Sequence, residues 1–337
     1  MRRPTRLRDV AEAVGLDVST VSKVLNEDPG IRVRPDTEER IRAAALRLGY
    51  QPNANARNLR LRRTNAFGLL LPDITNPVYA AIVRGAVRRA DDDGIAILLV
   101  EAPDGLNEAL QARLVTEKRV DGLLIASARS AGVSGQVLER QGVPHVFVNR
   151  RQSRAKMPSI TVDDEAGAAL AARTLIESGH ERLGVISGPR DVDTAVRRLA
   201  GFRAAVEAAG LAEPVNCIGD YSPAGGFDAM TRMLRGRRRP TAVFASNFLA
   251  AVGALAAANA LDVDVPGDLS VIGYDGGTIS GFMVPPLTSV RMPFEVLGSQ
   301  AVGMLSDVIA GRRVLDVIVR DPAPELVDRG SVAPPAS

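Results

Sequence analysis

The chain has 337 residues, of which 46% are hydrophobic and 24% are charged, a composition typical of a globular protein of about two domains. One cysteine, Cys217, excludes an internal disulfide, and with only two histidines we expect no metal site, no cofactor and no catalytic residues. Because the first residues are charged throughout and no apolar run reaches about 18 residues, we expect no signal peptide and no membrane span, and hence a cytoplasmic protein.

Positive charge is concentrated near the N-terminus. Residues 1–63 contain 14 Lys and Arg against 8 Asp and Glu, a net charge of +6, whereas residues 64–337 contain 28 against 31, a net charge of −3. A short basic segment on a nearly neutral body is typical of a protein whose N-terminal part meets a polyanion such as DNA. A solvated basic tail without such a partner is the alternative.

Three short helices are predicted within the first 50 residues. Apolar residues recur from Leu7 at i, i+3, i+4 and i+7, which predicts a helix that ends at Gly15. A second helix is predicted over 19–26, and a third from Pro35 to Gly49. Two helices joined by a tight turn and braced by a third form the helix-turn-helix layout, which places the second helix in a DNA major groove. A three-helix module that binds no nucleic acid is the alternative.

The next segment, residues 51–63, is basic and short. Pro52 stops the third helix, and Asn53 can cap a new helix of about two turns, too short to be stable alone in water. Such a helix makes physical sense if it folds on DNA beside a partner copy, with Leu59 as a wedge in the minor groove. A solvated basic linker is the alternative.

From residue 64 onwards, strands and helices alternate. Apolar runs predict a first series of strands at 66–71, 95–100, 120–126 and 144–148, with helices at about 78–92, 106–118 and 134–141 between them. A second series of strands follows at 183–187, 214–219, 241–245 and 269–274. Alternating strands and helices indicate parallel sheets covered on both faces, so we expect two α/β lobes, with the charged stretch 150–158 at the first crossing.

Polar and aromatic residues follow the predicted strands. In open α/β sheets, ligands bind at the carboxyl ends of the strands. Aromatic faces beside an arginine and amide or carboxylate acceptors suit a sugar or a nucleoside, whose hydroxyl groups both donate and accept. A structural hydrogen bond or core packing is the alternative for each of them. The candidates are Tyr79, Asn149, Arg198, Tyr221, Asn247, Asp275 and Phe294.

Short strings along nearly the whole chain, from about residue 5 to 330, resemble the LacI-type bacterial repressors in the same order. In the first quarter they are LRDVAEAVG (7–15), STVSKVLN (19–26), LGYQPN (48–53) and FGLL (67–70). Farther on they are VDGLL (120–124), SGHERLG (178–184), RLAGF (198–202), IGYD (272–275) and PLTSV (286–290).

The resemblance implies a small all-α helix-turn-helix head and a two-lobed α/β body of Rossmann-like, parallel-sheet subdomains, similar to type I periplasmic binding proteins. It implies three crossings between the lobes, near 158–162, 287–291 and 320–325. The expected parts are a DNA-binding domain (1–50), a hinge helix or linker (51–63), an effector-binding and dimerisation domain (64–330) and a tail (331–337). The first lobe is expected at about 64–160 and 291–321, and the second at about 161–290 and 322–330.

The resemblance also implies site residues. DNA contacts are expected from Arg6, Leu7, Arg8, Val18, Ser19, Thr20, Ser22, Lys23, Asn26, Asn53, Ala56, Arg57 and Leu59. Effector contacts are expected from the strand-end candidates above and from Thr194.

Four positions depart from the family pattern. Lys23 replaces the commoner arginine, Asp17 stands at a position that often carries a phosphate-binding hydroxyl, Phe248 makes one corner of the pocket apolar, and Val192 argues against a purine corepressor.

These expectations combine into a ligand-responsive transcription regulator, a repressor of a carbohydrate or nucleoside utilisation operon. It is expected to bind palindromic double-stranded operator DNA as a homodimer, with a sugar or nucleoside between the lobes modulating DNA affinity and no membrane partner. An enzyme is disfavoured, since the sequence has no G-x-S-x-G, no Walker A loop and no G-x-G-x-x-G after a strand. A sugar-binding protein without a regulatory role and an architectural DNA-binding protein are the alternatives.

Overall fold

The computed structural model divides into two compact units, a head (Met1–Thr64) and a body (Asn65–Ser337). The residues that it describes are 5–26, 30–50, 63–103, 107, 110, 112–129, 134–152 and 156–336. The hinge candidates Asn53, Ala56, Arg57 and Leu59 lie outside these residues. Across the described ranges, none of the helices is long and apolar enough to span a bilayer.

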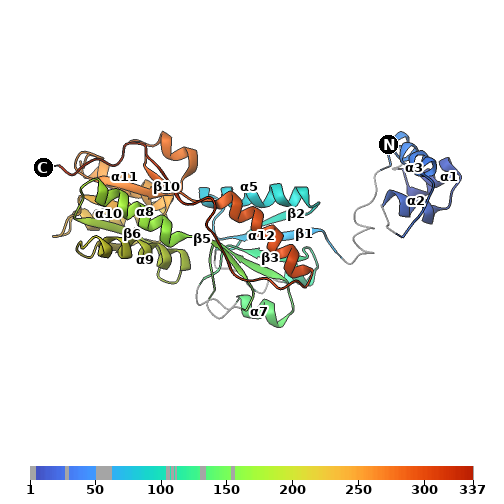
Figure 1. Cartoon of the computed structure of the whole chain (residues 1–337), viewed down its shortest axis with the longest axis horizontal. Helices are drawn as coiled ribbons and strands as arrows, with labels where there is room; N and C mark the ends of the chain where they lie inside the picture. The colour runs from blue at the N-terminus through green and yellow to red at the C-terminus, as the bar shows by residue number, and fades with distance from the viewer. Residues whose placement is uncertain are drawn as a thin grey trace. The chain divides into compact units, whose positions relative to one another are not determined.

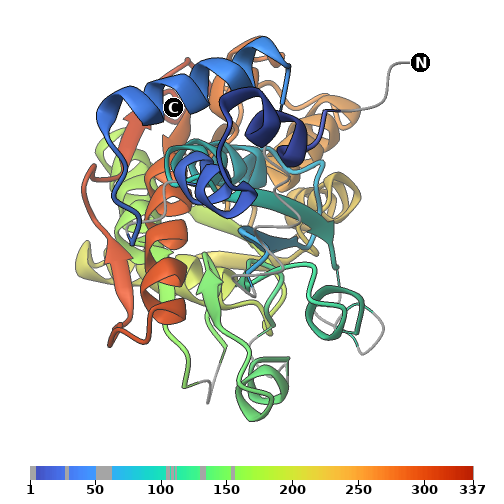
Figure 2. The ribbon, with the colours of Figure 1, turned by 90° about the vertical axis from the view of Figure 1, so that its right-hand side faces the viewer.

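The head consists of the helices α1 (Leu7–Val14), α2 (Val18–Leu25) and α3 (Pro35–Arg47), shown in blue in Figures 1 and 2. Gly15 ends α1 in the left-handed conformation at φ 67°, which turns the chain sharply into α2. The three helices bury one small apolar core, made of Val10, Ala11, Val14, Val21, Val24, Ile41, Ala44 and Ala45. The predicted layout of the head is therefore confirmed.

The first lobe is built on a six-stranded sheet in which every pair of neighbouring strands is parallel. Helices α5 (Pro77–Asp92) and α12 (Phe294–Ile309) pack against each other on one face, and the single turn η1 (Ala112–Thr116) and α7 (Ser134–Arg140) lie on the other. In sheet order the strands are β11 (Val317–Val319), β5 (Ser159–Val162), β4 (His145–Val148), β3 (Gly122–Ile125), β1 (Ala66–Leu71) and β2 (Ala96–Glu101).

The second lobe repeats this plan with one antiparallel strand at its edge, where β12 pairs with β10. Helices α8 (Asp164–Glu177) and α9 (Asp193–Ala208) pack together, as do α10 (Pro223–Leu234) and α11 (Phe248–Ala260), and the 3-10 turn η2 spans Gly277–Phe282. In sheet order the strands are β12 (Glu325–Val327), β10 (Ser289–Arg291), β9 (Ser270–Tyr274), β8 (Ala242–Ala245), β6 (Leu183–Ser187) and β7 (Val215–Ile218).

The chain crosses between the lobes three times, as Figure 1 lets the reader follow. It leaves the first sheet after Val162, returns after Arg291 and crosses again between β11 and β12. The first and second crossings therefore lie one or two residues later than the boundaries expected from sequence, because β5 pairs with β4 and β11 while β10 pairs with β9 and β12.

The segment expected as a tail from residue 331 is built into the second lobe. The Ser331 hydroxyl donates to the carbonyl of Val271 at 2.6 Å and accepts from the backbone N–H of Thr288 at 2.8 Å. Farther along, the Ala333 carbonyl lies 2.8 Å from a ring nitrogen of His180. His180 therefore has a structural role, and residues 331–333 belong to the lobe rather than to a free extension.

Candidate DNA-reading helix and effector site

The second helix of the head presents a polar face to solvent. Val21 and Val24 point into the head core, whereas Ser19 and Lys23 are exposed and Val18 is 40% exposed. At the start of α1, Arg6 and Arg8 are exposed and Leu7 is half-buried. The exposed face of α2 therefore carries the residues predicted to lie nearest to base edges.

Three other predicted DNA-contact residues, two in α2 and one at its C-cap, have side chains that are partly buried in the head. Thr20 and Ser22 are half-buried, and the side-chain amide of Asn26 donates to the Ser22 carbonyl at 2.7 Å, closing the end of the helix. Asp17 caps the start of α2 by accepting the backbone N–H of Ser19 at 2.7 Å. The hydrogen bonds from Ser19 hold the pKa of Asp17 below its ordinary value, so this position presents a carboxylate where the family pattern often has a hydroxyl.

The effector candidates of the body come from the carboxyl ends of both sheets. Asn149 follows β4 of the first lobe, while Tyr221, Asn247 and Asp275 follow β7, β8 and β9 of the second. The others stand near the starts of helices: Tyr79, Thr194 and Phe294 lie in the first turns of α5, α9 and α12, and Arg198 lies in the second turn of α9. Burial raises the pKa of Tyr79 above its ordinary value, while the charges of Arg150 and Arg198 act to lower it, so Tyr79 of the first lobe lies within electrostatic range of Arg198 of the second.

Backbone strain is concentrated at these candidates. Among the described residues, six that are not glycine have a positive φ, and three of the six are Asn149 (65°), Tyr221 (69°) and Asp275 (66°). The left-handed conformation costs roughly 1–3 kcal/mol for a residue such as tyrosine, and it persists only where the surrounding structure imposes it. Strain of this kind accumulates at ligand-binding sites, because it aims side chains that ordinary geometry would turn away.

The same residues carry buried polar atoms without hydrogen-bond partners among the described residues: Asn149 Oδ1, Tyr221 Oη and Asp275 Oδ2. Such atoms are rare in folded proteins, because each costs free energy unless a ligand or water satisfies it. The other atoms of this kind include Ser127 Oγ and Ser246 Oγ, which were missed by sequence reasoning. Both serines directly follow predicted strands, at 120–126 and 241–245, so the rule that found the other candidates also applies to them.

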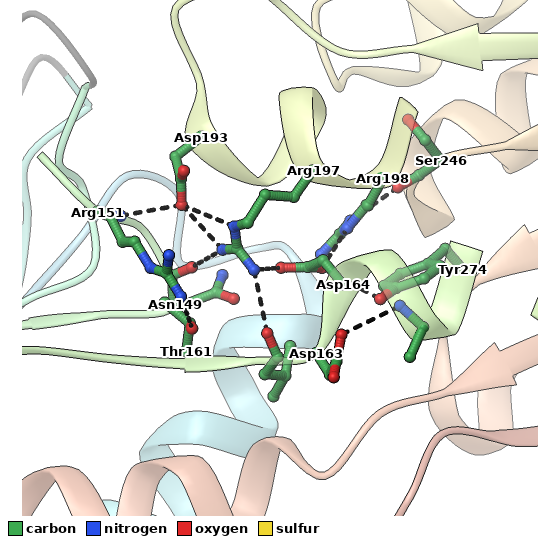
Figure 3. Close-up of polar contacts among 12 residues, drawn as sticks. Asn149, Arg151, Thr161, Asp163, Asp164, Asp193, Arg197, Arg198, Ser246 and Tyr274 are labelled. Atoms are coloured by element: carbon green, nitrogen blue, oxygen red, sulfur yellow. Dashed lines mark hydrogen bonds and ion pairs between the residues drawn. The ribbon is translucent and has the colours of Figure 1, made fainter. Parts of the chain in front are cut away.

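Arg198 is fixed by a buried carboxylate (Figure 3). Its Nε donates to Asp164 Oδ1 at 2.7 Å, its Nη1 donates to the Ser246 carbonyl at 2.7 Å, and its guanidinium lies 4.0 Å from the centre of the Tyr274 ring. Burial acts to lower the pKa of Arg198, but Asp164 and Tyr274 outweigh it and raise that pKa well above its ordinary value. The guanidinium is therefore a permanently charged group held in one orientation.

Four other candidates form the walls of the site rather than its free polar groups. Thr194, Tyr79 and Phe294 are 2%, 4% and 3% exposed, and the last two belong to the apolar core of the body. Both ends of the Asn247 amide are engaged: Oδ1 accepts the Ala250 N–H that caps α11, and Nδ2 donates to the Tyr221 carbonyl. Asn247 thus orients Tyr221.

Asp275 is expected to make stability depend on pH. Burial raises the pKa of the Asp275 carboxyl well above the ordinary value, although Arg198 acts to lower it. The stability that the protonated carboxyl contributes is therefore complete below the unfolded pKa of about 3.9 and is lost as the pH rises through the raised pKa of the folded state. We expect Asp275→Asn, which stays neutral, to melt at a higher temperature than the unsubstituted protein at pH 7–8 and to lose this advantage as the pH falls. Thermal unfolding between pH 5 and 8 measures this, with the exposed Asp228→Asn as control. An equal difference at every pH contradicts it.

Within the part of the chain that the structure describes, no group of three or more His, Cys, Asp or Glu side chains is arranged to hold a metal ion. The candidate residues offer hydrogen-bonding groups, the fixed positive charge of Arg198 and aromatic side chains. These are means of binding a polar organic molecule.

Comparisons with known proteins agree with this organisation. A family model described as "Bacterial regulatory proteins, lacI family" matches residues 6–53, and one described as "Periplasmic binding protein-like domain" matches residues 172–332. The ribose operon repressor of Escherichia coli (strain K12) is 37% identical over 304 residues, which cover 89% of this chain and 91% of the relative. The HTH-type transcriptional repressor PurR of Proteus mirabilis (strain HI4320) is 34% identical and covers 97% of this chain and 96% of the relative.

A solved structure shows the same architecture along nearly the whole chain. The lac repressor dimer bound to operator and the anti-inducer ONPF matches with a TM-score of 0.83 at 28% identity, covering 98% of this chain and 100% of that chain. The relatives that match over most of the chain are repressors, not enzymes. The chain belongs to the LacI family of bacterial regulatory proteins.

Proposed function

We propose that the protein represses transcription by binding a palindromic operator as a homodimer, and that a sugar or nucleoside bound between its lobes alters its affinity for DNA. The observation that carries the effector part is the set of strained residues from both lobes whose buried polar atoms lack partners among the described residues. Because the target is operator DNA, we place its action in the bacterial cytoplasm, at the nucleoid.

A sugar is the favoured effector class. The oxygens of Asn149, Tyr221 and Asp275 that lack partners among the described residues suit ligand hydroxyl groups, and the buried residues Val192 and Phe248 at the starts of α9 and α11 are apolar. The similarity to a ribose operon repressor makes ribose the first compound to test. A thermal-shift screen of pentoses, hexoses and nucleosides tests the proposal, since a ligand that binds only the folded protein raises the melting temperature. A panel in which only nucleosides act contradicts the sugar assignment.

Lys23 is proposed to donate to a base acceptor from the exposed face of α2. We expect Lys23→Ala to weaken binding to the preferred operator by about 1–3 kcal/mol and binding to random DNA by less. Fluorescence anisotropy on both DNAs at one salt concentration measures the difference, after selection of the operator from a random library. The exposed Arg47→Ala on α3 serves as a charge-matched control. Equal losses on the two DNAs would show that Lys23 touches only phosphate.

The homodimer is supported by exposed apolar surface on both lobes. On the first lobe, Leu98 and Leu99 of the edge strand β2 are 40% and 46% exposed, beside a strand edge that pairs with no other strand among the described residues. On the second lobe, Phe282 and Val284 are 86% and 94% exposed near η2. Contiguous patches of exposed apolar side chains typically mark protein interfaces. Sedimentation velocity of the whole chain is expected to give the mass of a dimer.

A further inference from the structure

Arg197, the neighbour of Arg198 on α9, joins the two lobes (Figure 3). Its Nη1 donates to the Val162 carbonyl at 3.0 Å and its Nη2 donates to the Asn149 carbonyl at 2.9 Å. Both carbonyls belong to the first lobe, at the carboxyl ends of β5 and β4. The side chain is only 11% exposed, so these bonds are shielded from water and salt.

Two carboxylates of the second lobe hold the other side of the same guanidinium. Its Nε donates to Asp193 Oδ2 at 2.9 Å, and its Nη1 lies 2.5 Å from Asp164 Oδ2. Asp193 also reaches the first lobe, since its Oδ2 accepts the backbone N–H of Arg151 at 3.2 Å. Side chains of the second lobe therefore bind the first lobe in two ways. Arg197 donates to first-lobe carbonyls, and Asp193 accepts from a first-lobe amide.

Both ends of this tie support an effector candidate. The carbonyl that Arg197 holds belongs to Asn149, whose backbone is strained and whose Oδ1 is unpartnered among the described residues. The carboxylate that it shares, Asp164, orients Arg198 through its other oxygen. Arg197 thus contacts the immediate support of one candidate from each lobe.

We propose that Arg197 is a positioning residue, which holds the lobes together and keeps Asn149 and Arg198 in register across the effector site. The proposal rests on the proposed effector function of that site. It also explains why an arginine stands here: only a planar fork of five N–H donors can reach two carbonyls and two carboxylates at once, and a lysine has three donors on one nitrogen.

The packing of α9 makes this arrangement possible. Gly201, one turn beyond Arg197, lies where a Cβ would come within 2.2 Å of the Glu165 carbonyl oxygen, so α8 and α9 approach closely and Asp164 comes within reach of both arginines. Burial acts to lower the pKa of Arg197, but Asp164 and Asp193 raise it above its ordinary value, which keeps the group charged.

Hydrogen exchange of the unliganded, full-length protein tests the tie directly. The Arg151 amide donates across the lobes, whereas the Asn149 amide donates to the Ile160 carbonyl inside the first sheet and is an internal reference. With single-residue resolution, we expect Arg197→Met to speed exchange of the Arg151 amide about tenfold to hundredfold, as the loss of a hydrogen bond to a charged group predicts, and to leave the reference unchanged. Unchanged exchange at Arg151 in the folded variant overturns the proposal.

Matched variants separate this role from general stabilisation. Arg129→Met removes the exposed ion pair that Arg129 forms across the lobes with Asp191. Arg203, which lies on α9 with Arg197, forms an ion pair with Glu213 inside the second lobe, and Arg203→Met removes it. Neither is expected to change exchange at Arg151. Arg197→Lys keeps a positive charge between the carboxylates, so we expect its melting temperature to lie close to that of the unsubstituted protein. We expect the Arg151 amide to exchange as fast in this variant as in Arg197→Met. Full protection of that amide by lysine overturns the proposal, because charge alone would then join the lobes.

A second readout uses D-ribose as the probe. If ribose binds the unsubstituted protein, Arg197→Met is expected to lower its affinity about tenfold or more, while Arg129→Met leaves it unchanged. Equal ribose affinity in the protein with and without Arg197 overturns the positioning role. If no sugar or nucleoside of the panel binds the unsubstituted protein, the proposed effector function fails, and the exchange measurement alone decides whether Arg197 ties the lobes.

Discussion

Replacing Asp164 by alanine is expected to destabilise the body by about 3–5 kcal/mol, the cost of leaving buried charges without their partner. The carboxylate is fully buried, pairs with Arg197 and Arg198, and accepts a hydrogen bond from the Tyr274 hydroxyl at 3.1 Å. Its removal leaves Arg198 with one carbonyl acceptor and the face of an aromatic ring. Urea unfolding followed by circular dichroism measures the change in the free energy of unfolding.

The preceding residue provides the control. Asp163 caps α8 by accepting the Ala166 N–H and forms an ion pair with Arg320, whose side chain is 68% exposed. Loss of a helix cap costs about 0.5–2 kcal/mol, so Asp163→Ala is expected to be clearly milder than the change one position later. If the two variants unfold at the same urea concentration, the buried carboxylate does not hold the arginines as its contacts indicate.

Most strands and helices could be predicted from the sequence, because each depends on the spacing of apolar residues and on the residues at its own ends. The apolar runs at 66–71 and 183–187 match β1 and β6 without a shift, and the helix predicted from Pro35 begins there. The short strands β5 and β10 were not predicted as strands, because their residues fall in the segments expected to cross between the lobes. Each has only three or four residues, and its sheet membership depends on pairing with strands that are distant in sequence.

The candidate site could be located from sequence but not fully assigned. Strand ends identified Asn149, Tyr221 and Asp275, because the carboxyl ends of parallel strands meet at one edge of a sheet. The capping role of Asn247 has a local signal, an amide directly before an apolar helix, which the ligand interpretation overlooked. The role proposed for Arg197 has no such signal, since its partners come from both lobes and adjacent arginines look alike in a sequence.

The buried ion pair between Arg198 and Asp164 decides which substitution of Arg198 can test effector binding. From sequence alone, Arg198→Ala is expected to abolish the effector response and keep the fold. The ion pair with Asp164 makes the alanine variant a poor test, because lost stability and lost binding would be confounded. Arg198→Lys retains a positive charge beside Asp164 and gives up the planar fork, so it is the variant in which binding can be measured on a folded protein.

We expect Arg198→Lys to lower the affinity for the effector about tenfold to hundredfold, corresponding to about 1.5–3 kcal/mol for a lost hydrogen bond to a charged group. Calorimetric titration with a sugar that raises the melting temperature measures it, with Arg203→Lys on the same helix as control. Because coupling between two binding sites is reciprocal, the variant should keep its DNA affinity without ligand and respond only at higher ligand concentrations. If the ligand is an inducer, repression then persists; if it is a corepressor, repression is lost. Sensitivity equal to that of the unsubstituted protein would show that Arg198 does not contact the effector.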